Sequence, residues 1–266
     1  MGNNDIYTHY LKAAAKIARQ AGDFLLTGLN QAKKVDFKGE VDLVTAFDRQ
    51  SEEMIFNELN ELFPGLNFLA EESIRKDNHS DFGWIVDPLD GTTNFSHGLP
   101  VFCVSIALAF KGEVVAGVVY DPNRAELFSA IKSGGAFLND RPARVSSTGE
   151  LDKSLLATGF PYDVRTSPDN NLNYFSRFAL KAQAIRRCGS AALDLCYTAC
   201  GRFDGFWEIK LKPWDLAAGS LLVKEAGGLT TDLSGREFGL KSPDIVASNG
   251  HIHLAMLEII KISEAR

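Results

Sequence analysis

The chain has few cysteines and no long hydrophobic run, and these two gaps exclude several classes of protein. Its 266 residues include four cysteines (Cys103, Cys188, Cys196 and Cys200) and no Cys-x-x-Cys pair, so a disulfide-stapled scaffold is not indicated and reduced thiols are expected. The longest apolar run, residues 101–110, has about half the ~20 residues that a membrane span needs. The first residues also lack the basic and apolar segments of a signal peptide. We therefore expect a cytoplasmic protein without membrane contact.

Basic residues are in the minority. The sequence has 28 Lys and Arg against 34 Asp and Glu, a net charge of −6. This balance argues against direct nucleic-acid binding, which needs a basic surface, and leaves room for a carboxylate-rich cation site. Hydrophobic residues make up 45% of the chain, which is ordinary for a globular protein, and a chain of this length buries a core without disulfides.

The first half of the chain has the pattern of helices followed by strands. Apolar residues at helical spacing predict helices over 5–28 and 48–63. Short β-rich runs come next, and Lys111-Gly112 between two of them predicts a tight antiparallel hairpin. The predicted strands are residues 67–70, 84–87, 102–110, 114–120 and 126–130.

The second half alternates between strands and helices, which favours a sheet covered by helices. The predicted elements are strands at 155–158, 204–208, 229–232 and 245–248, and helices at 168–182, 190–200, 215–226 and 251–263. A polar, turn-rich stretch at 140–154 separates the two patterns. We expect an α+β domain over residues 1–145 and an α/β domain over residues 146–266.

The densest group of chemically active side chains is at residues 84–95, Trp-Ile-Val-Asp-Pro-Leu-Asp-Gly-Thr-Thr-Asn-Phe. An apolar strand delivers Asp87 at its end, and the Pro88 turn brings Asp90 to the same side. Carboxylates, a backbone carbonyl at Leu89 and two hydroxyls form an oxygen-only set that suits Mg²⁺. Gly91 permits close approach of the backbone to a ligand.

Further acidic residues lie at the ends of predicted elements. Glu71-Glu72 follow a strand, and Asp48 and Asp215 stand at helix starts. Each has a plainer interpretation: a solvated loop for the glutamates, and helix capping for the two aspartates. These acidic residues indicate a functional site only when they are considered together with the group at residues 84–95.

Four motifs together resemble the inositol monophosphatase family: residues 42–48 (Asp-Leu-Val-Thr-x-x-Asp), 71–73 (Glu-Glu-Ser), 87–95 and 214–219 (Trp-Asp-Leu-Ala-Ala-Gly). Their order and spacing fit over nearly the whole chain. Residues 189–194 and 201–208 are similar to the bacterial members. The resemblance implies the layered αβαβα sandwich of the sugar phosphatases, two or three Mg²⁺ ions, lithium sensitivity and a homodimer.

The resemblance also implies roles for individual residues. Metal ligands would be Glu71, Asp87, the Leu89 carbonyl, Asp90 and Asp215. Thr92, with Asp48 behind it, would orient and deprotonate water, and Glu71 and Asp90 would complete the catalytic set. Gly91 and Thr92 would hold the phosphate, while Asp90, Ala191, Glu208 and Asp215 would line the substrate site. Lys38, in the polar loop at 33–45, would either neutralise phosphate or shape a third metal position.

The implied activity is hydrolysis of a small phosphate monoester, with myo-inositol 1-phosphate first among substrates. The alternative is hydrolysis of fructose 1,6-bisphosphate, with Arg165, Arg186 or Lys210 holding a second phosphate, or of a broader range of sugar phosphates. A binding role with RNA polymerase in transcription is the alternative of another class, since some bacterial relatives have one.

Three weaker features remain. Cys196 and Arg202 have the spacing of cysteine-dependent phosphatases, yet a buried, inert thiol on a helix is favoured. Arg186 and Arg187 either line the substrate entrance or face solvent. His251 and His253 are expected on the surface, where the last helix begins.

Overall fold

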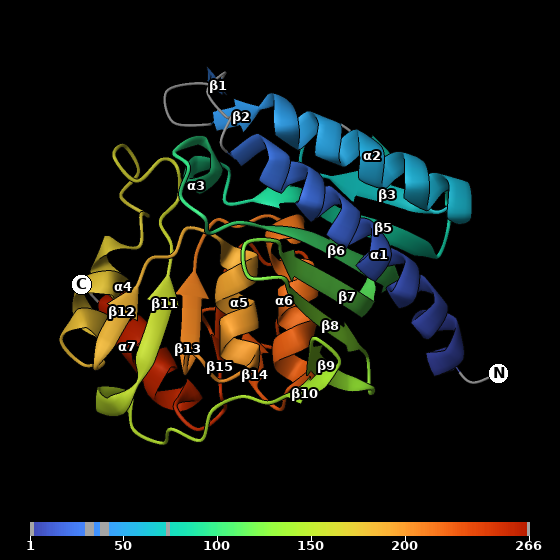
Figure 1. The fold of residues 1–266 in the computed structure, drawn as a ribbon. Helices are drawn as coiled ribbons and strands as arrows, with labels where there is room; N and C mark the ends of the chain where they lie inside the picture. Colours follow the sequence, from blue (N-terminus) through green and yellow to red (C-terminus); the bar gives the residue numbers. More distant parts are fainter. Residues whose placement is uncertain (1–2, 30–34, 38–42, 73–74, 265–266) are drawn as a thin grey trace.

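Two N-terminal helices cover one face of the larger of two main sheets (Figure 1). The computed structural model describes residues 3–29, 35–37, 43–72 and 75–264. The helices are α1 (Asn3–Leu29) and α2 (Ala46–Leu62). The predicted apolar stripe of α1 is confirmed, because Ala18, Ala21 and Leu25 are fully buried against the sheet. A short antiparallel pair, β1 (Val35–Phe37) and β2 (Leu43–Thr45), stands apart from both main sheets.

The first main sheet has eight strands in the order β10-β9-β8-β7-β6-β5-β3-β4. Its strands are β3 (Asn67–Ala70), β4 (Arg75–Lys76), β5 (Phe82–Asp90), β6 (Cys103–Phe110), β7 (Glu113–Asp121), β8 (Glu126–Ile131), β9 (Gly135–Leu138) and β10 (Arg141–Ala143). Only β3 and β5 pair in parallel; the other neighbours are antiparallel. The predicted hairpin at Lys111-Gly112 joins β6 to β7. The short helix α3 (Thr92–Ser96) follows β5.

The second main sheet has five strands in the order β12-β11-β13-β15-β14. They are β11 (Leu155–Thr158), β12 (Ala184–Arg186), β13 (Gly205–Glu208), β14 (Leu229–Thr231) and β15 (Ile245–Ser248). The remaining helices are α4 (Leu172–Ala179), α5 (Ala191–Ala199), α6 (Pro213–Glu225) and α7 (His253–Glu264), with a 3₁₀ turn at Leu151–Lys153. No helix in the described part of the chain is long and apolar enough to cross a membrane.

The two sheets and the helices form five layers. Helices α5 and α6 lie between the sheets, and their apolar residues pack against both, whereas α4 and α7 cover the outer face of the second sheet (Figure 1). With α1 and α2 on the far side, the order is αβαβα, which confirms the predicted fold. The last strand of the first sheet ends at Ala143, and the first strand of the second sheet begins at Leu155. The division into domains 1–145 and 146–266 stays a prediction.

The helix predicted over 168–182 is shorter than expected. Asn171 has a left-handed backbone (φ 71°) and is buried, with its side-chain amide donating to Thr158 Oγ1 at 2.8 Å and its carbonyl accepting from Trp207 Nε1 at 2.7 Å. A residue held in this conformation cannot continue a helix, so α4 begins at Leu172. The chain beyond α4 forms the edge strand β12, which the sequence pattern does not reveal.

The surface position predicted for His253 is wrong. The side chain is 2% exposed, and its ring nitrogens lie 2.8 Å from Ser248 Oγ and 3.0 Å from Thr231 Oγ1. Two hydroxyls from neighbouring strands satisfy both nitrogens, which removes the cost of burying the ring. His251, two residues earlier, is exposed as expected.

Candidate active site

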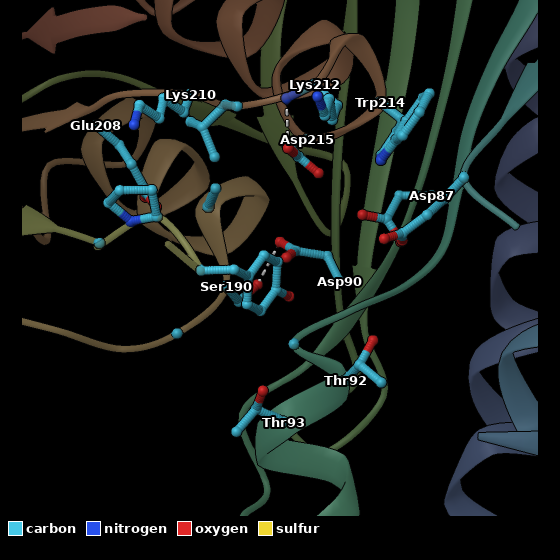
Figure 2. Close-up of a pocket in the computed structure, with 18 of the residues that line it drawn as sticks. Asp87, Asp90, Thr92, Thr93, Ser190, Glu208, Lys210, Lys212, Trp214 and Asp215 are labelled. Atoms are coloured by element: carbon cyan, nitrogen blue, oxygen red, sulfur yellow. Dashed lines mark hydrogen bonds between the residues drawn. The ribbon is translucent and has the colours of Figure 1, made fainter. Parts of the chain in front are cut away.

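A cavity of about 410 Å³ opens where the first sheet meets the second half of the chain. Glu71 follows β3, Asp87 and Asp90 end β5, and Asp215 comes from the first turn of α6. Figure 2 shows the carboxylates of Asp87, Asp90 and Asp215 directed toward the same space. Residues 144 positions apart in sequence (71 and 215) are therefore brought to one site by the packing of α6 under the sheet.

The turn at the end of β5 positions its two aspartates. The Leu89 N–H donates to Asp87 Oδ1 at 3.0 Å, and the pairing of β5 with β6 shifts register between Asp87 and Asp90. Such a bulge re-aims side chains, so both carboxylates reach the cavity. The Ser51 hydroxyl, in α2, donates a hydrogen bond to the Pro88 carbonyl oxygen at 3.0 Å and fixes the turn.

The backbone turns sharply after Asp90. Gly91 has φ +102°, and a Cβ there would lie 2.8 Å from the Val101 carbonyl oxygen, so only glycine fits. Thr92 then starts α3, and its hydroxyl lies 3.1 Å from the Leu89 carbonyl oxygen and 3.5 Å from Asp48 Oδ1. The predicted grouping of Thr92 with a buried Asp48 behind it is present, although the second distance is long.

Asp90 is held by residues that the sequence reasoning did not single out. The Ser190 hydroxyl and the Ala192 N–H donate to Asp90 Oδ2 at 2.6 and 2.7 Å (Figure 2). Ser190 is also the N-cap of α5, accepting from the Leu193 N–H at 3.4 Å. The signal for the cap was available, because Gly189-Ser190 precedes an apolar helix, but a cap motif does not name a distant partner.

Asp215 combines two of the functions considered for it. Its Oδ2 accepts a hydrogen bond from the Lys212 N–H at 2.7 Å, which caps α6. The residue also lines the cavity beside Trp214 (Figure 2). Capping therefore does not compete with a role in the site.

The acidic residues of the cavity destabilise one another's charged forms. Burial raises the pKa of Glu71, and Asp215, Asp48, Glu72 and Asp90 raise that pKa further. Burial and then Glu71 raise the pKa of Asp87 well above its ordinary value. Burial, with Asp90 nearby, raises the pKa of Asp215 to about 7. Groups of this kind are stabilised by a proton or by a cation.

The donor set suits a hard divalent cation. Carboxylates and a backbone carbonyl supply oxygen only, as Mg²⁺ prefers. The Leu89 carbonyl, which accepts the Thr92 hydroxyl, keeps a second lone pair. Among the described residues, no group of three or more acidic, histidine or cysteine side chains is arranged closely enough to hold a metal ion.

A different set of groups forms the wall on the side of the second sheet. Ala191 and Glu208 line the cavity as predicted, together with Asp194 and Arg187. Of the two arginines predicted for the substrate entrance, Arg187 lines the cavity and Arg186 does not, and both are exposed. Glu208 is buried, and a Cβ on Gly159 would collide with its carboxyl group.

Of the three residues considered for a second phosphate, only Lys210 lines the cavity. Arg165 and Arg186 are not among its lining residues, and Lys210 directs its Nζ to Asp163 and to Ser167 Oγ, each at 2.9 Å. Lys38 lies outside the described residues, as does Asp42. The other predicted site residues line the cavity, except Asp48, which reaches it through Thr92.

The geometry excludes the cysteine chemistry considered above. Cys196 is fully buried in α5, and burial raises the pKa of its thiol well above the ordinary value. A thiolate nucleophile needs the opposite shift. Arg202, the other residue of that spacing, donates to the Glu126 carboxylate.

Comparisons with known proteins place the whole chain in one family. The sequence profile of the Inositol monophosphatase family matches residues 7–265. Inositol monophosphatase 1 of Solanum lycopersicum is 43% identical, with 99% of each chain covered. A Neisseria meningitidis protein named putative Nus factor SuhB is 44% identical over 94% of this chain and 97% of its own.

A solved structure matches in three dimensions as well. Inositol monophosphatase from Anabaena superposes with a TM-score of 0.88 and 41% identity, covering 96% of both chains. The match of sequence and fold over nearly the whole length is decisive: the chain belongs to the inositol monophosphatase family.

Proposed function

We propose that this chain is a Mg²⁺-dependent phosphatase that hydrolyses myo-inositol 1-phosphate to myo-inositol and phosphate. The observation that carries the proposal is the convergence of Glu71, Asp87, Asp90 and Asp215 from both halves on one cavity. A phosphate monoester is a dianion that repels nucleophiles, and its uncatalysed hydrolysis is extremely slow. Carboxylates would repel this dianion, so an acidic cavity can bind it only if the carboxylates hold cations.

The proposed metal ligands are the four acidic side chains and the Leu89 carbonyl, for two or three ions. When bound, the ions supply the positive charge that acidifies water and stabilises the leaving oxygen. Thr92 Oγ1 accepts a hydrogen bond from the attacking water and orients it, and as the proton of water moves to Thr92 Oγ1, the hydroxyl proton of Thr92 passes to the Asp48 carboxylate. The water oxygen bonds to phosphorus, the ester P–O bond breaks, and the departing alcohol oxygen takes up a proton from solvent water.

The chain's own groups hold the rest of the substrate. Backbone N–H groups at Gly91 and Thr92 face the phosphate in this proposal, since the first N–H groups of a helix have no partner within it. Asp90, Ala191 and Glu208 face the alcohol. Catalysis is then mainly positioning and electrostatic stabilisation.

The family resemblance supports further features of the proposal. We infer a homodimer, inhibition by lithium, and a cytoplasmic location. Gel filtration with light scattering tests the first, and a lithium titration of phosphate release tests the second.

The substrate is tested by paired kinetics on myo-inositol 1-phosphate and fructose 1,6-bisphosphate. We expect a clearly higher kcat/KM for the monophosphate, because Lys210 is already engaged with Asp163. A preference for the bisphosphate would overturn the proposed substrate. Glu208→Gln should raise KM for the inositol ester more than it lowers kcat, whereas an equal loss on every ester would contradict contact with the alcohol.

A second candidate function comes from the name of the Neisseria relative, putative Nus factor. A role in transcription would use the protein surface rather than the cavity. Capture of RNA polymerase from cell extract by wild type and by Asp90→Asn alike would support it. No capture by either protein would remove it.

A further inference from the structure

A second cavity lies apart from the active site, where the β9–β10 hairpin meets the C-terminal end of α5. Its volume is about 500 Å³, and it shares no lining residue with the first cavity. Figure 1 shows β9 and β10 at the opposite end of α5 from α3. The lining residues are Glu126, Leu138, Asn139, Arg141, Pro142, Ala143, Arg144 and Cys200. Pockets of roughly 300–1,000 Å³ are the usual size for small-molecule ligands, so this cavity has room for one.

Two of the lining side chains are cations without a partner. Arg141 and Arg144 are exposed, and neither guanidinium has an ion pair or a hydrogen bond with another described residue. The lining carboxylate, Glu126, is already neutralised, because Arg202 donates to both of its oxygens, from Nη1 to Oε2 at 2.6 Å and from Nη2 to Oε1. The cavity therefore has two uncompensated positive charges, in a chain whose net charge is −6.

The hairpin that carries the two arginines is fixed in place. Asn139 and Asp140 have left-handed backbones (φ 47° and 62°), as a two-residue turn between β9 and β10 requires. The Asn139 side chain accepts a hydrogen bond from the Leu127 N–H at 2.8 Å and donates one to the Ala125 carbonyl at 3.1 Å. These bonds tie the hairpin to the start of β8, so the cavity wall is formed before a ligand binds. Asp140 belongs to the turn and does not line the cavity.

The chemistry of the wall narrows the choice of ligand. β10 is the outermost strand of the first sheet, and Pro142 at its centre has no N–H, which disfavours a peptide that adds a strand to this edge. Guanidinium groups donate paired hydrogen bonds to phosphate and carboxylate oxygens. A phosphate group carries up to two negative charges and a carboxylate only one, so phosphate balances the two cations better.

We propose that the second cavity is a binding site for a small phosphorylated anion, with Arg141 and Arg144 donating hydrogen bonds to its phosphate oxygens. The site is separate from the first cavity, whose converging carboxylates repel an anion when no cation is bound. Binding here does not depend on the reaction in the first cavity.

The test is calorimetric titration with inorganic pyrophosphate in EDTA, which keeps metal ions out of the first cavity. We expect one site per chain in the wild type. Its affinity should be at least about tenfold lower when Arg141→Gln and Arg144→Gln are combined, because both changes remove charge-assisted hydrogen bonds. No binding to the wild type, or equal binding to the double variant, overturns the proposal.

Two other arginines supply matched controls. Arg165 is exposed and lines neither cavity, and Arg187 is exposed and lines the first. Arg165→Gln and Arg187→Gln should both keep the affinity of the wild type. An equal loss in Arg165→Gln would indicate non-specific attraction, and a loss confined to Arg187→Gln would assign the anion to the first cavity. Either result overturns the proposal.

NMR of the wild type gives a readout for which no variant has to fold. The side-chain N–H signals of Arg141 and Arg144 should shift as pyrophosphate is added in EDTA, while the signal of Arg165 stays in place. Succinate, whose two carboxylates carry one charge each, should bind more weakly than pyrophosphate. Unshifted signals from Arg141 and Arg144 overturn the site, and succinate binding as tight as that of pyrophosphate overturns its assignment to phosphate.

Discussion

The Ser190 hydroxyl donates a 2.6 Å hydrogen bond to Asp90 Oδ2 across 100 positions of sequence. Ser190 caps α5, and Asp90 ends β5, so one bond joins the inner helix layer to the first sheet at the cavity. The Ala192 N–H reinforces it at 2.7 Å. The site is therefore complete only when both halves of the chain have folded together.

Ser190→Ala should weaken the site while the fold survives. The substitution removes a charge-assisted bond to Asp90 and a helix cap, and we expect kcat/KM for the inositol ester to fall about tenfold. Kinetics and thermal unfolding measure both effects. Ser220→Ala is the matched control, because Ser220 is buried in α6 and bonds only within its helix, to the Ala217 carbonyl. Equal activity losses in the two variants would contradict the account of Ser190.

Added Mg²⁺ should raise the melting temperature of the wild type. A cation relieves the repulsion that raises the pKa values of Glu71 and Asp87, and a ligand that binds only the folded state stabilises it. Asp87→Asn should largely lose this response, whereas Asp152→Asn, a surface change outside the cavity, should retain it. Differential scanning calorimetry with and without Mg²⁺ measures this response. An undiminished response in Asp87→Asn would rule out Asp87 as a ligand of Mg²⁺.

The cation-free protein should become less stable as pH rises. Burial raises the pKa of Glu208 and of Asp194 well above their ordinary values, so the folded chain keeps protons that the unfolded chain releases. The free energy of unfolding then falls from about pH 4 upward, toward the raised pKa values. Urea unfolding at about pH 5 and about pH 8 measures the decrease. It should be smaller in Glu208→Gln, and stability that rises with pH would contradict the burial of uncompensated acids.

Thiol reagents should leave the activity intact. Cys196 and Cys103 are fully buried, and burial raises the pKa of both thiols. Thiolate formation and access are both needed for alkylation. Phosphate release after iodoacetamide treatment checks this, and inactivation that tracks modification of Cys196 would revive the cysteine mechanism.

The sequence was sufficient for the layers and for most of the cavity. Helical spacing predicts α1, α2 and α6, and the family resemblance predicts that Asp87, Asp90 and Asp215 meet at one site. These features depend on local periodicity or on contiguous motifs.

Features that depend on long-range partners could not be predicted. Nothing near Asn171 in sequence indicates that its side chain bonds Trp207, which requires the left-handed turn before α4. The buried position of His253 likewise depends on hydroxyls from β14 and β15. Asp194 lines the cavity, but an acid in the first turn of a helix has an ordinary local explanation, so the sequence alone does not assign it to the site.

Phosphate release from myo-inositol 1-phosphate, measured with Mg²⁺ and with EDTA for wild type and Asp90→Asn, tests the central claim most directly. Since losing a partner of a metal ligand already costs about 10–100-fold, Asp90→Asn should lose at least roughly 100-fold. We predict activity only in the wild type with Mg²⁺. Activity that persists in EDTA, or in folded Asp90→Asn, would contradict a mechanism built on the acidic cavity.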